Sequence, residues 1–200
     1  QAATLLAEGM ELWSGRDDAA KLKGALDKFE AAYNADPTNR EAATLLTRGW
    51  YFWGDAKTDV PEEKLASWDT AVQWGGRCMA INSEFTELLK KGDETERTAI
   101  RVMGIEDAGC LYWTASALGK WAKLKGFATL LKHKDTAKAY IAKVEDLDEN
   151  YFYAGPDRYF GAVYAVAPSF AGGDLSQAVI RFDESISIPP AYLGTKVLKA

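Results

Sequence analysis

Hydrophobic residues recur at intervals of three and four along almost the whole chain, and runs of β-branched residues are nearly absent. This spacing is typical of an α-helix with one buried face, whereas a half-buried strand would alternate at every second residue. Alanine, leucine, lysine and glutamate, which are good helix formers, dominate the composition. The pattern therefore predicts an all-α protein, a compact bundle of about ten helices, with no sheet.

Helix-breaking residues divide this pattern into segments. Asp36-Pro37 ends one segment because the residue before a proline disfavours the α conformation, and Pro61 suits the first turn of another. Asn39 and Ser83 are suitable N-caps. The expected helices cover approximately residues 5–13, 22–33, 39–54, 61–81, 83–91, 105–124, 127–131, 137–147, 156–164 and 175–186, and a terminal helical turn follows Pro189-Pro190. We expect residues 1–200 to form one domain.

One residue spacing occurs near both ends of the chain. It resembles the Ala-x3-Phe-x2-Ala-x4-Pro pattern in the second helix of a tetratricopeptide repeat, in which small residues allow close helix packing and proline ends the helix. Its residues are Ala25, Phe29, Ala32 and Pro37 in the first copy, and Ala178, Phe182, Ser185 and Pro190 in the second. No regular 34-residue period connects them, so we expect degenerate repeat-like helix pairs near residues 2–37 and 157–190 within a compact bundle.

A more specific resemblance rests on three blocks. Leu5-Leu6-x-Glu8-Gly9 and Ala25 to Pro37 form the first two. The third runs from Phe160-Gly161-Ala162-x-Tyr164 through Pro168 to Gly172-Gly173-Asp174-Leu175. Together they resemble TatT, the tetratricopeptide-type component of tripartite ATP-independent periplasmic (TRAP) transporters; residues 55–106 match more weakly.

This resemblance implies a periplasmic helical protein that binds a small apolar or amphipathic ligand, such as a lipid, a sterol or an organic acid. It also implies a periplasmic substrate-binding protein as partner, a homotrimer, and in many members a lipid anchor on the outer membrane. A lipid-bearing cysteine would precede Gln1, and a start without Met is typical of a processed chain. The competing interpretation is a protein-interaction scaffold without a small-molecule ligand.

Large aromatic side chains are the main candidates for a ligand site. Seven tryptophans are many for 200 residues, and indole rings on facing helices can line an apolar pocket, although each can equally fill the core. Arg158 adjoins Tyr159 in the block most like the family, and Arg48, Arg77 and Arg101 are weaker candidates for an anionic ligand. The predicted ligand-binding residues are Trp50, Trp53, Trp68, Trp74, Tyr112, Trp113, Arg158, Tyr159 and Tyr164.

Composition and charge exclude several function classes. The net charge of −5 has both signs interspersed, which argues against nucleic-acid binding. His133 is the only histidine and lies between lysines, and no common catalytic or metal-binding motif occurs, so we predict no enzyme, cofactor or metal. Cys78 and Cys110 leave two alternatives open, buried free thiols or one bridge, and the frequent burial of free cysteine favours thiols.

Overall fold

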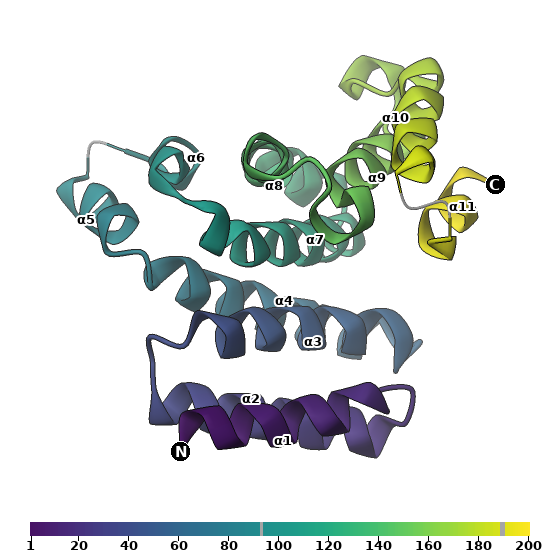
Figure 1. Ribbon diagram of the computed structural model, residues 1–200. Coiled ribbons are helices and arrows are strands. Elements are labelled where there is room, and N and C mark those ends of the chain that lie inside the picture. The colour runs from purple at the N-terminus through teal and green to yellow at the C-terminus, as the bar shows by residue number, and fades with distance from the viewer. Residues whose placement is uncertain (93, 189–190) are drawn as a thin grey trace.

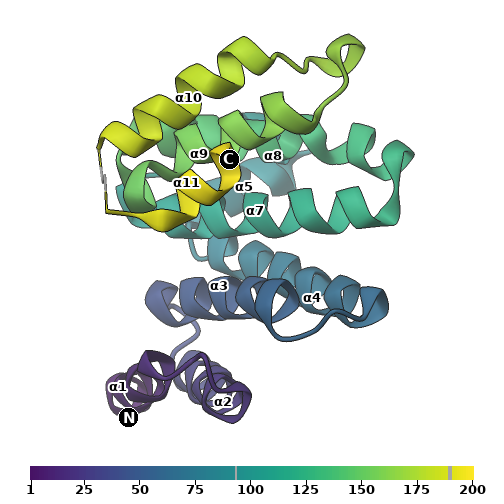
Figure 2. The ribbon, with the colours of Figure 1, turned by 90° about the vertical axis from the view of Figure 1, so that its right-hand side faces the viewer.

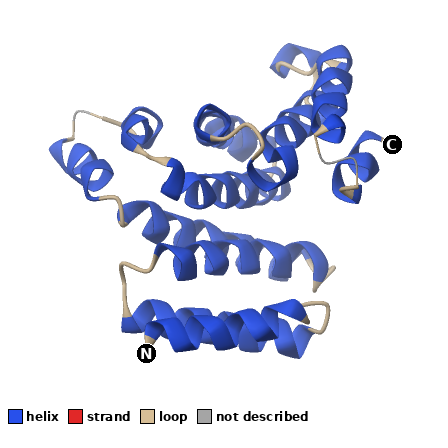
Figure 3. Cartoon of the chain, viewed as in Figure 1, coloured by secondary structure: helices blue, strands red, loops and turns tan. Residues whose placement is uncertain are grey.

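The protein is α-helical throughout the part of the chain that the structure describes. A computed structural model describes residues 1–92, 94–188 and 191–200, and none of these residues forms a strand (Figure 3). The α-helices are α1 (Ala2–Ser14), α2 (Ala19–Ala35), α3 (Arg40–Ala56), α4 (Pro61–Ala80), α5 (Ser83–Lys91), α6 (Glu96–Ala99), α7 (Ala108–Lys125), α8 (Phe127–Leu147), α9 (Tyr151–Val166), α10 (Leu175–Ser187) and α11 (Leu193–Lys199). Three short 3₁₀ helices are η1 (Ile100–Val102), η2 (Ile105–Asp107) and η3 (Ser169–Ala171). The predicted all-α bundle is confirmed.

The helices pack as successive layers from one end of the molecule to the other. α1 packs against α2 and α3 against α4, and the second pair lies directly on the first. α7 then packs against α4 on one side and against α8 on the other, while α9 and α10 form the last hairpin (Figures 1 and 2). The N-terminus and the C-terminus consequently lie at opposite ends of the stack.

Polar side chains fix several helix starts, of which that at Asn39 was predicted. The side chains of Asp18, Asn39 and Asp174 accept hydrogen bonds from backbone N–H groups in the first turns of α2, α3 and α10. Pro61 occupies the first position of α4, as expected. The cap of α5 is Asn82, one residue before the predicted Ser83, because its Oδ1 accepts the N–H of Phe85.

Two predicted boundaries are wrong. The expected break between residues 131 and 137 is absent, because the polar residues there contain neither glycine nor proline, and α8 runs through them. The long apolar helix begins at Ala108, after η2, and not at residue 105. The predicted start of a helix at Pro156 agrees with the structure: α9 includes Tyr151 and a left-handed segment at residues 152–154, and its regular right-handed part begins only after Ala154.

Both copies of the repeat spacing pack by the same contact. Phe29 is fully buried, and a Cβ on Gly9 of α1 would lie 2.6 Å from its ring. Phe182 is likewise buried, and a Cβ on Gly161 of α9 would lie 2.8 Å from its ring. In each pair, glycine in the first helix provides the space for phenylalanine in the second. Pro190 of the second copy lies outside the described residues.

A disulfide joins the middle layers. Cys78 of α4 and Cys110 of α7 are bonded, with their Cα atoms 5.5 Å apart, so the sequence preference for free thiols is wrong. The reason is tertiary: α4 and α7 cross closely where Gly75 lies against Thr114, and a Cβ on this glycine would lie 1.9 Å from the Thr114 hydroxyl. Disulfides of this kind form in oxidising compartments.

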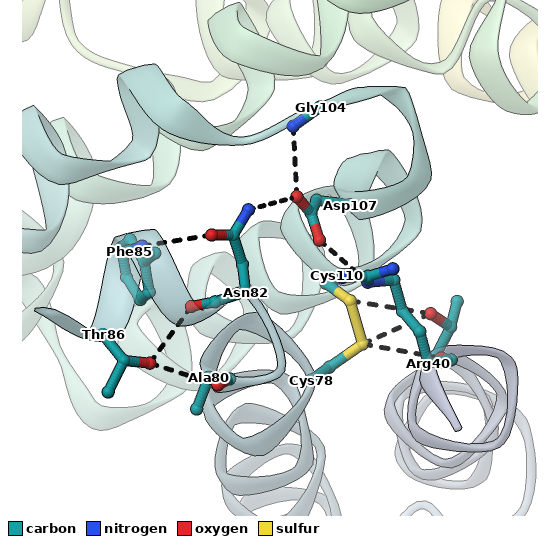
Figure 4. A network of polar contacts seen from close by, with 10 residues as sticks. Arg40, Cys78, Ala80, Asn82, Phe85, Thr86, Gly104, Asp107 and Cys110 are labelled. Atoms are coloured by element: carbon teal, nitrogen blue, oxygen red, sulfur yellow. Dashed lines mark hydrogen bonds and ion pairs between the residues drawn. A yellow bond between two sulfur atoms is a disulfide. The ribbon is translucent and has the colours of Figure 1, made fainter. Parts of the chain in front are cut away.

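A polar network lies beside the bridge (Figure 4). The buried carboxylate of Asp107 accepts hydrogen bonds from Asn82 Nδ2 at 2.8 Å and from the Gly104 N–H at 3.1 Å. Its other oxygen forms an ion pair with Arg40 Nε at 2.9 Å, at an angle outside that of a hydrogen bond. The network connects the start of α3, the loop before α5 and the start of α7.

Candidate ligand-binding site

Aromatic and arginine side chains gather where α3, α7 and the start of α9 meet. The Trp113 ring lies 4.7 Å from that of Phe152 and 5.0 Å from that of Tyr112, both edge-on. Edge-to-face contacts of this kind stabilise a cluster beyond the burial of apolar area. We call this group the aromatic–arginine cluster; its members are Arg48, Tyr51, Tyr112, Trp113, Tyr151, Phe152, Arg158 and Tyr192.

The backbone beside the cluster forms one left-handed turn. Phe152, Tyr153 and Ala154 have φ angles of 46°, 61° and 53°, a conformation that costs about 1–2 kcal/mol for each non-glycine residue. The next residue must be glycine, because a Cβ at position 155 would lie 2.6 Å from the Tyr112 ring. The turn presents the Phe152 ring to Trp113 and directs two carbonyl groups towards Arg158.

Arg158 holds this turn from inside the protein. Its guanidinium donates to the carbonyl oxygens of Tyr153 at 2.9 Å and Phe152 at 3.0 Å, and to the Tyr112 hydroxyl at 3.0 Å. The residue is only 7 % exposed. Within the described residues, no carboxylate lies within ion-pair distance of it, so neutral oxygens and aromatic rings surround the positive charge.

Arg48 of α3 supplies a second, more accessible cation. Its guanidinium carbon lies 4.8 Å from the centre of the Phe152 ring, 5.0 Å from that of Trp113 and 5.3 Å from that of Trp13. Burial lowers the pKa of Arg48 from its ordinary value, and the charge of Arg16 adds to this effect. The described part of the chain places no carboxylate at ion-pair distance from this half-buried side chain either.

Burial keeps three tyrosine hydroxyl groups in or beside the cluster protonated. Burial raises the pKa of Tyr112 above its usual value, against an opposing effect of Arg158. Burial also raises the pKa of Tyr51 and of Tyr159. These tyrosines are therefore neutral hydrogen-bonding groups, which is the polar component that an amphipathic ligand requires.

The structure brings some of the predicted residues together and leaves others apart. Tyr112, Trp113 and Arg158 belong to the cluster, and Tyr159 faces α7, with its hydroxyl 3.3 Å from where a Cβ on Gly119 would lie. Trp68 is buried and donates to the Tyr51 carbonyl at 3.3 Å, which places it at the edge of the cluster.

The remaining predicted residues lie elsewhere. Trp50 and Trp53 are partly buried against the core of α1 to α3. Trp74 packs edge-on against Tyr33 at 5.1 Å, and Arg77 covers its outer side. Tyr164 lines a shallow surface depression of about 420 Å³, and a second of about 430 Å³ is lined by Thr95, Glu96, Arg97 and Thr136. Neither depression is lined by the aromatic–arginine cluster.

Sequence reasoning missed Tyr151, Phe152 and Tyr192 as cluster members. A signal was present, since Tyr151-Phe152-Tyr153 is a run of three aromatic residues directly before Gly155-Pro156. Arg48 was only a weak candidate, because nothing in α3 indicates that rings from α7 and α9 surround it.

Other site types find no support in the described residues. The part of the chain that the structure covers brings no three histidine, cysteine, aspartate or glutamate side chains together as a metal site. Among the described helices, none combines the length and the apolarity that crossing a membrane requires.

The fold and the cluster define an all-α protein of layered helical hairpins with a cationic aromatic centre. The family model described as TRAP transporter T-component matches residues 69–200, and the chain belongs to this family. It is therefore an accessory component of a transport system on the periplasmic side. The match includes α7 to α11 and hence most of the cluster. No curated protein matches the sequence.

Proposed function

We propose that this T-component holds a small apolar or amphipathic molecule at the aromatic–arginine cluster and passes it to or from a periplasmic substrate-binding protein. The observation that carries the proposal is Arg48, a half-buried guanidinium that lies against the rings of Trp113 and Phe152 and has no carboxylate of the described residues at ion-pair distance. A charge that is partly removed from water is expected to have a polar partner, and a ligand could provide one.

The surroundings of Arg48 fit such a ligand. Its neighbouring rings offer apolar surface on α7 and α9, while the guanidinium offers a planar set of donors that suits a carboxylate or a sulfate. A fatty acid, a sterol derivative or an organic acid combines these features. We propose no catalytic role, cofactor or metal for this site.

Tryptophan fluorescence and thermal unfolding test the proposal with a panel of laurate, 1-dodecanol, cholesterol and succinate. A ligand present at a hundred times its Kd stabilises the folded protein by about 2.7 kcal/mol, which raises the melting temperature measurably. We expect laurate to stabilise the wild-type protein and Arg48→Gln to weaken this effect, because Arg48 is one of the two cations of the cluster.

Arg77→Gln is the matched control, since Arg77 also covers a tryptophan ring, Trp74 at 4.4 Å, but is exposed and lies away from the cluster. It should leave the response to laurate unchanged. The proposal would be contradicted if no compound of the panel changed the fluorescence or the melting temperature of the wild-type protein, or if both variants lost the response to laurate equally.

A scaffold without a small-molecule ligand is the second candidate. It is favoured by the large apolar side chains exposed near the C-terminus, such as Phe170 at 81 %, Val197 at 74 % and Leu175 at 72 %. Exposed apolar side chains of this size are available for contact with another protein. Phe170→Ser combined with Leu175→Ser should then weaken binding to the partner protein while leaving laurate binding intact.

The assembly and the domain organisation are also proposals. We treat residues 1–200 as one domain because α4 packs against both α3 and α7. The homotrimer, and a lipid anchor on the outer membrane, rest on the family resemblance alone. Native mass spectrometry of the protein from its source organism would report subunit number, bound ligand and lipid modification together.

A further inference from the structure

The last helix is attached to the protein through few side chains. Among the seven residues of α11, only Thr195 is buried. Leu193 is 69 % exposed and Val197 74 %, so the apolar side chains of this helix contribute little to its attachment. α11 packs against α9 and α10 at the C-terminal end of the stack (Figures 1 and 2).

The few contacts that hold α11 converge on Arg158 and the left-handed turn. The Thr195 hydroxyl accepts a long hydrogen bond of 3.4 Å from Arg158 and lies 3.0 Å from the Ser185 hydroxyl. The ring of Tyr192, directly before α11, lies 4.8 Å from the Arg158 guanidinium and stacks on Tyr153 at 4.6 Å. Lys199 adds an exposed ion pair with Asp183.

Among the described residues, Thr195 and Tyr192 lie on the outer side of Arg158, a buried cation. Its inner side is fixed by two carbonyl groups and the Tyr112 hydroxyl. On the side of α11, one hydroxyl and one ring face occupy the places where the guanidinium would otherwise donate hydrogen bonds to an oxyanion. A long bond to a neutral hydroxyl is a weak substitute for a charge-assisted bond.

We propose that α11 is a displaceable cover over Arg158, and that an amphipathic molecule with an oxyanion head group takes the place of Thr195 and Tyr192. The ligand's head group would bind the guanidinium, and its apolar part would lie along Tyr112, Phe152 and Trp113. This inference rests on the proposed function for the ligand, whereas the mobility of α11 can be tested without one.

The left-handed turn explains why such a cover would be poised to move. Tyr153 and Phe152 contact both Arg158 and Tyr192. The left-handed turn is therefore stabilised partly by the Arg158 guanidinium and partly by the residue that precedes α11. Residues held in this unfavourable conformation persist only where their surroundings hold them, and they cluster at sites that change state. Releasing α11 removes part of that support.

Hydrogen exchange followed by mass spectrometry on the full chain tests the cover. In the wild-type protein, the amides of residues 194–199 should exchange faster than those of α9 and α10. Thr195→Val keeps the shape of the side chain but removes its hydroxyl, and should accelerate exchange in α11 by about fivefold, the effect of one lost hydrogen bond. Val197→Ser, on the exposed side of the same helix, is the control and should change nothing.

Laurate and 1-dodecanol then test the coupling, because they differ only in the head group. Laurate should accelerate exchange in α11 of the wild-type protein, and dodecanol should not. Arg158→Gln should abolish the laurate effect, whereas Arg158→Lys, which keeps the charge, should retain part of it. Thr195→Val should bind laurate about fivefold more tightly, since the competing contact is lost.

The outcomes separate the two proposals. Exchange of α11 as slow as that of α10, or no effect of Thr195→Val, overturns the cover whether or not laurate binds. Laurate that binds, as judged by tryptophan fluorescence, but leaves exchange in α11 unchanged or slows it also overturns the cover. If laurate binds to no variant while α11 exchanges fast, the proposed ligand site and the binding of an oxyanion at Arg158 are both wrong. α11 would then be a mobile helix that does not cover a ligand site.

Discussion

The two ends of the stack are held together in different ways. From α1 to α7, helix pairs share buried apolar faces, and the Cys78–Cys110 bridge with the Asp107 network connects three layers. From α9 to α11, the first helix begins with a left-handed turn, and a buried arginine replaces part of the apolar contact. Most of the large apolar side chains that the described residues expose also belong to this second region or to the adjoining α8.

The two regions differ in how firmly their helices are fixed. A disulfide, a buried ion pair and close-packed glycines fix the position of α7, on which Tyr112 and Trp113 stand. The groups that close over them come from the less firmly packed α9–α11 region. Binding sites commonly combine a rigid base with an element of lower local stability.

The largest expected effect comes from the two equivalent phenylalanines. Phe29→Ala and Phe182→Ala each remove a buried ring and should cost about 3–5 kcal/mol locally. Hydrogen exchange should show lost protection in α1 to α3 for the first variant, and only in α9 to α11 for the second, because layers contact mainly their neighbours. If both variants lowered protection equally along the whole chain, the two regions would be one cooperative unit and the comparison would fail.

Loss of the disulfide should have the next largest effect. Cys78 and Cys110 are separated by 32 positions. Closing a loop of this length stabilises a protein by about 3–4 kcal/mol, because the cross-link lowers the conformational entropy of the unfolded chain. Urea unfolding of the Cys78→Ala, Cys110→Ala double variant should show this loss, as should wild-type protein in dithiothreitol. Protection of α10 should change little, and a loss there as large as in α4 would show that the bridge stabilises the C-terminal region as well.

The left-handed turn predicts a smaller and more specific effect. Ala165→Gly, in the regular part of α9, should lower the free energy of unfolding by about 1 kcal/mol. Ala154→Gly should leave it unchanged within about 0.5 kcal/mol, because relief of the unfavourable φ offsets the lost methyl group. Equal losses measured by urea unfolding would show that Ala154 is not held in a left-handed conformation in solution.

The smallest effect concerns the cap of α2 and its dependence on pH. Hydrogen bonds from the backbone of Lys21 lower the pKa of Asp18 below its usual value of 3.8. The charged cap therefore contributes stability above the unfolded pKa and loses it as the pH falls through the lower folded value. Asp18→Ala should be less stable than wild type at neutral pH, and the difference should vanish in acid; a difference that persists there would assign the effect to packing.

Much of the fold could be predicted because its determinants are local. Asn39, Pro61 and Asp174 determine helix starts through groups that lie within one turn of them. The repeat spacing also carried real packing information, since Phe29 and Phe182 both lie against a glycine of the preceding helix. The erroneous break in α8 arose where a run of polar residues was interpreted as a boundary, although polar residues continue a helix readily.

The candidate site was predictable only in part. Tyr112, Trp113 and Arg158 were selected from aromatic density and from the family-like block, and the structure places them in contact. Trp74 was selected by the same reasoning but lies against Tyr33, away from the cluster. Residue type alone does not distinguish a ring that faces the cluster from a ring that fills the core.

By itself, the sequence determined that this protein is helical, where most helices begin and end, and which family it resembles, because these properties follow from periodicity, caps and motifs close together in the chain. Only the tertiary structure decided that Cys78 meets Cys110, that Arg48 lies against rings of two other elements, and that Thr195 of α11 contacts Arg158. Those outcomes depend on how distant helices cross, and crossing is set by the summed packing of many side chains.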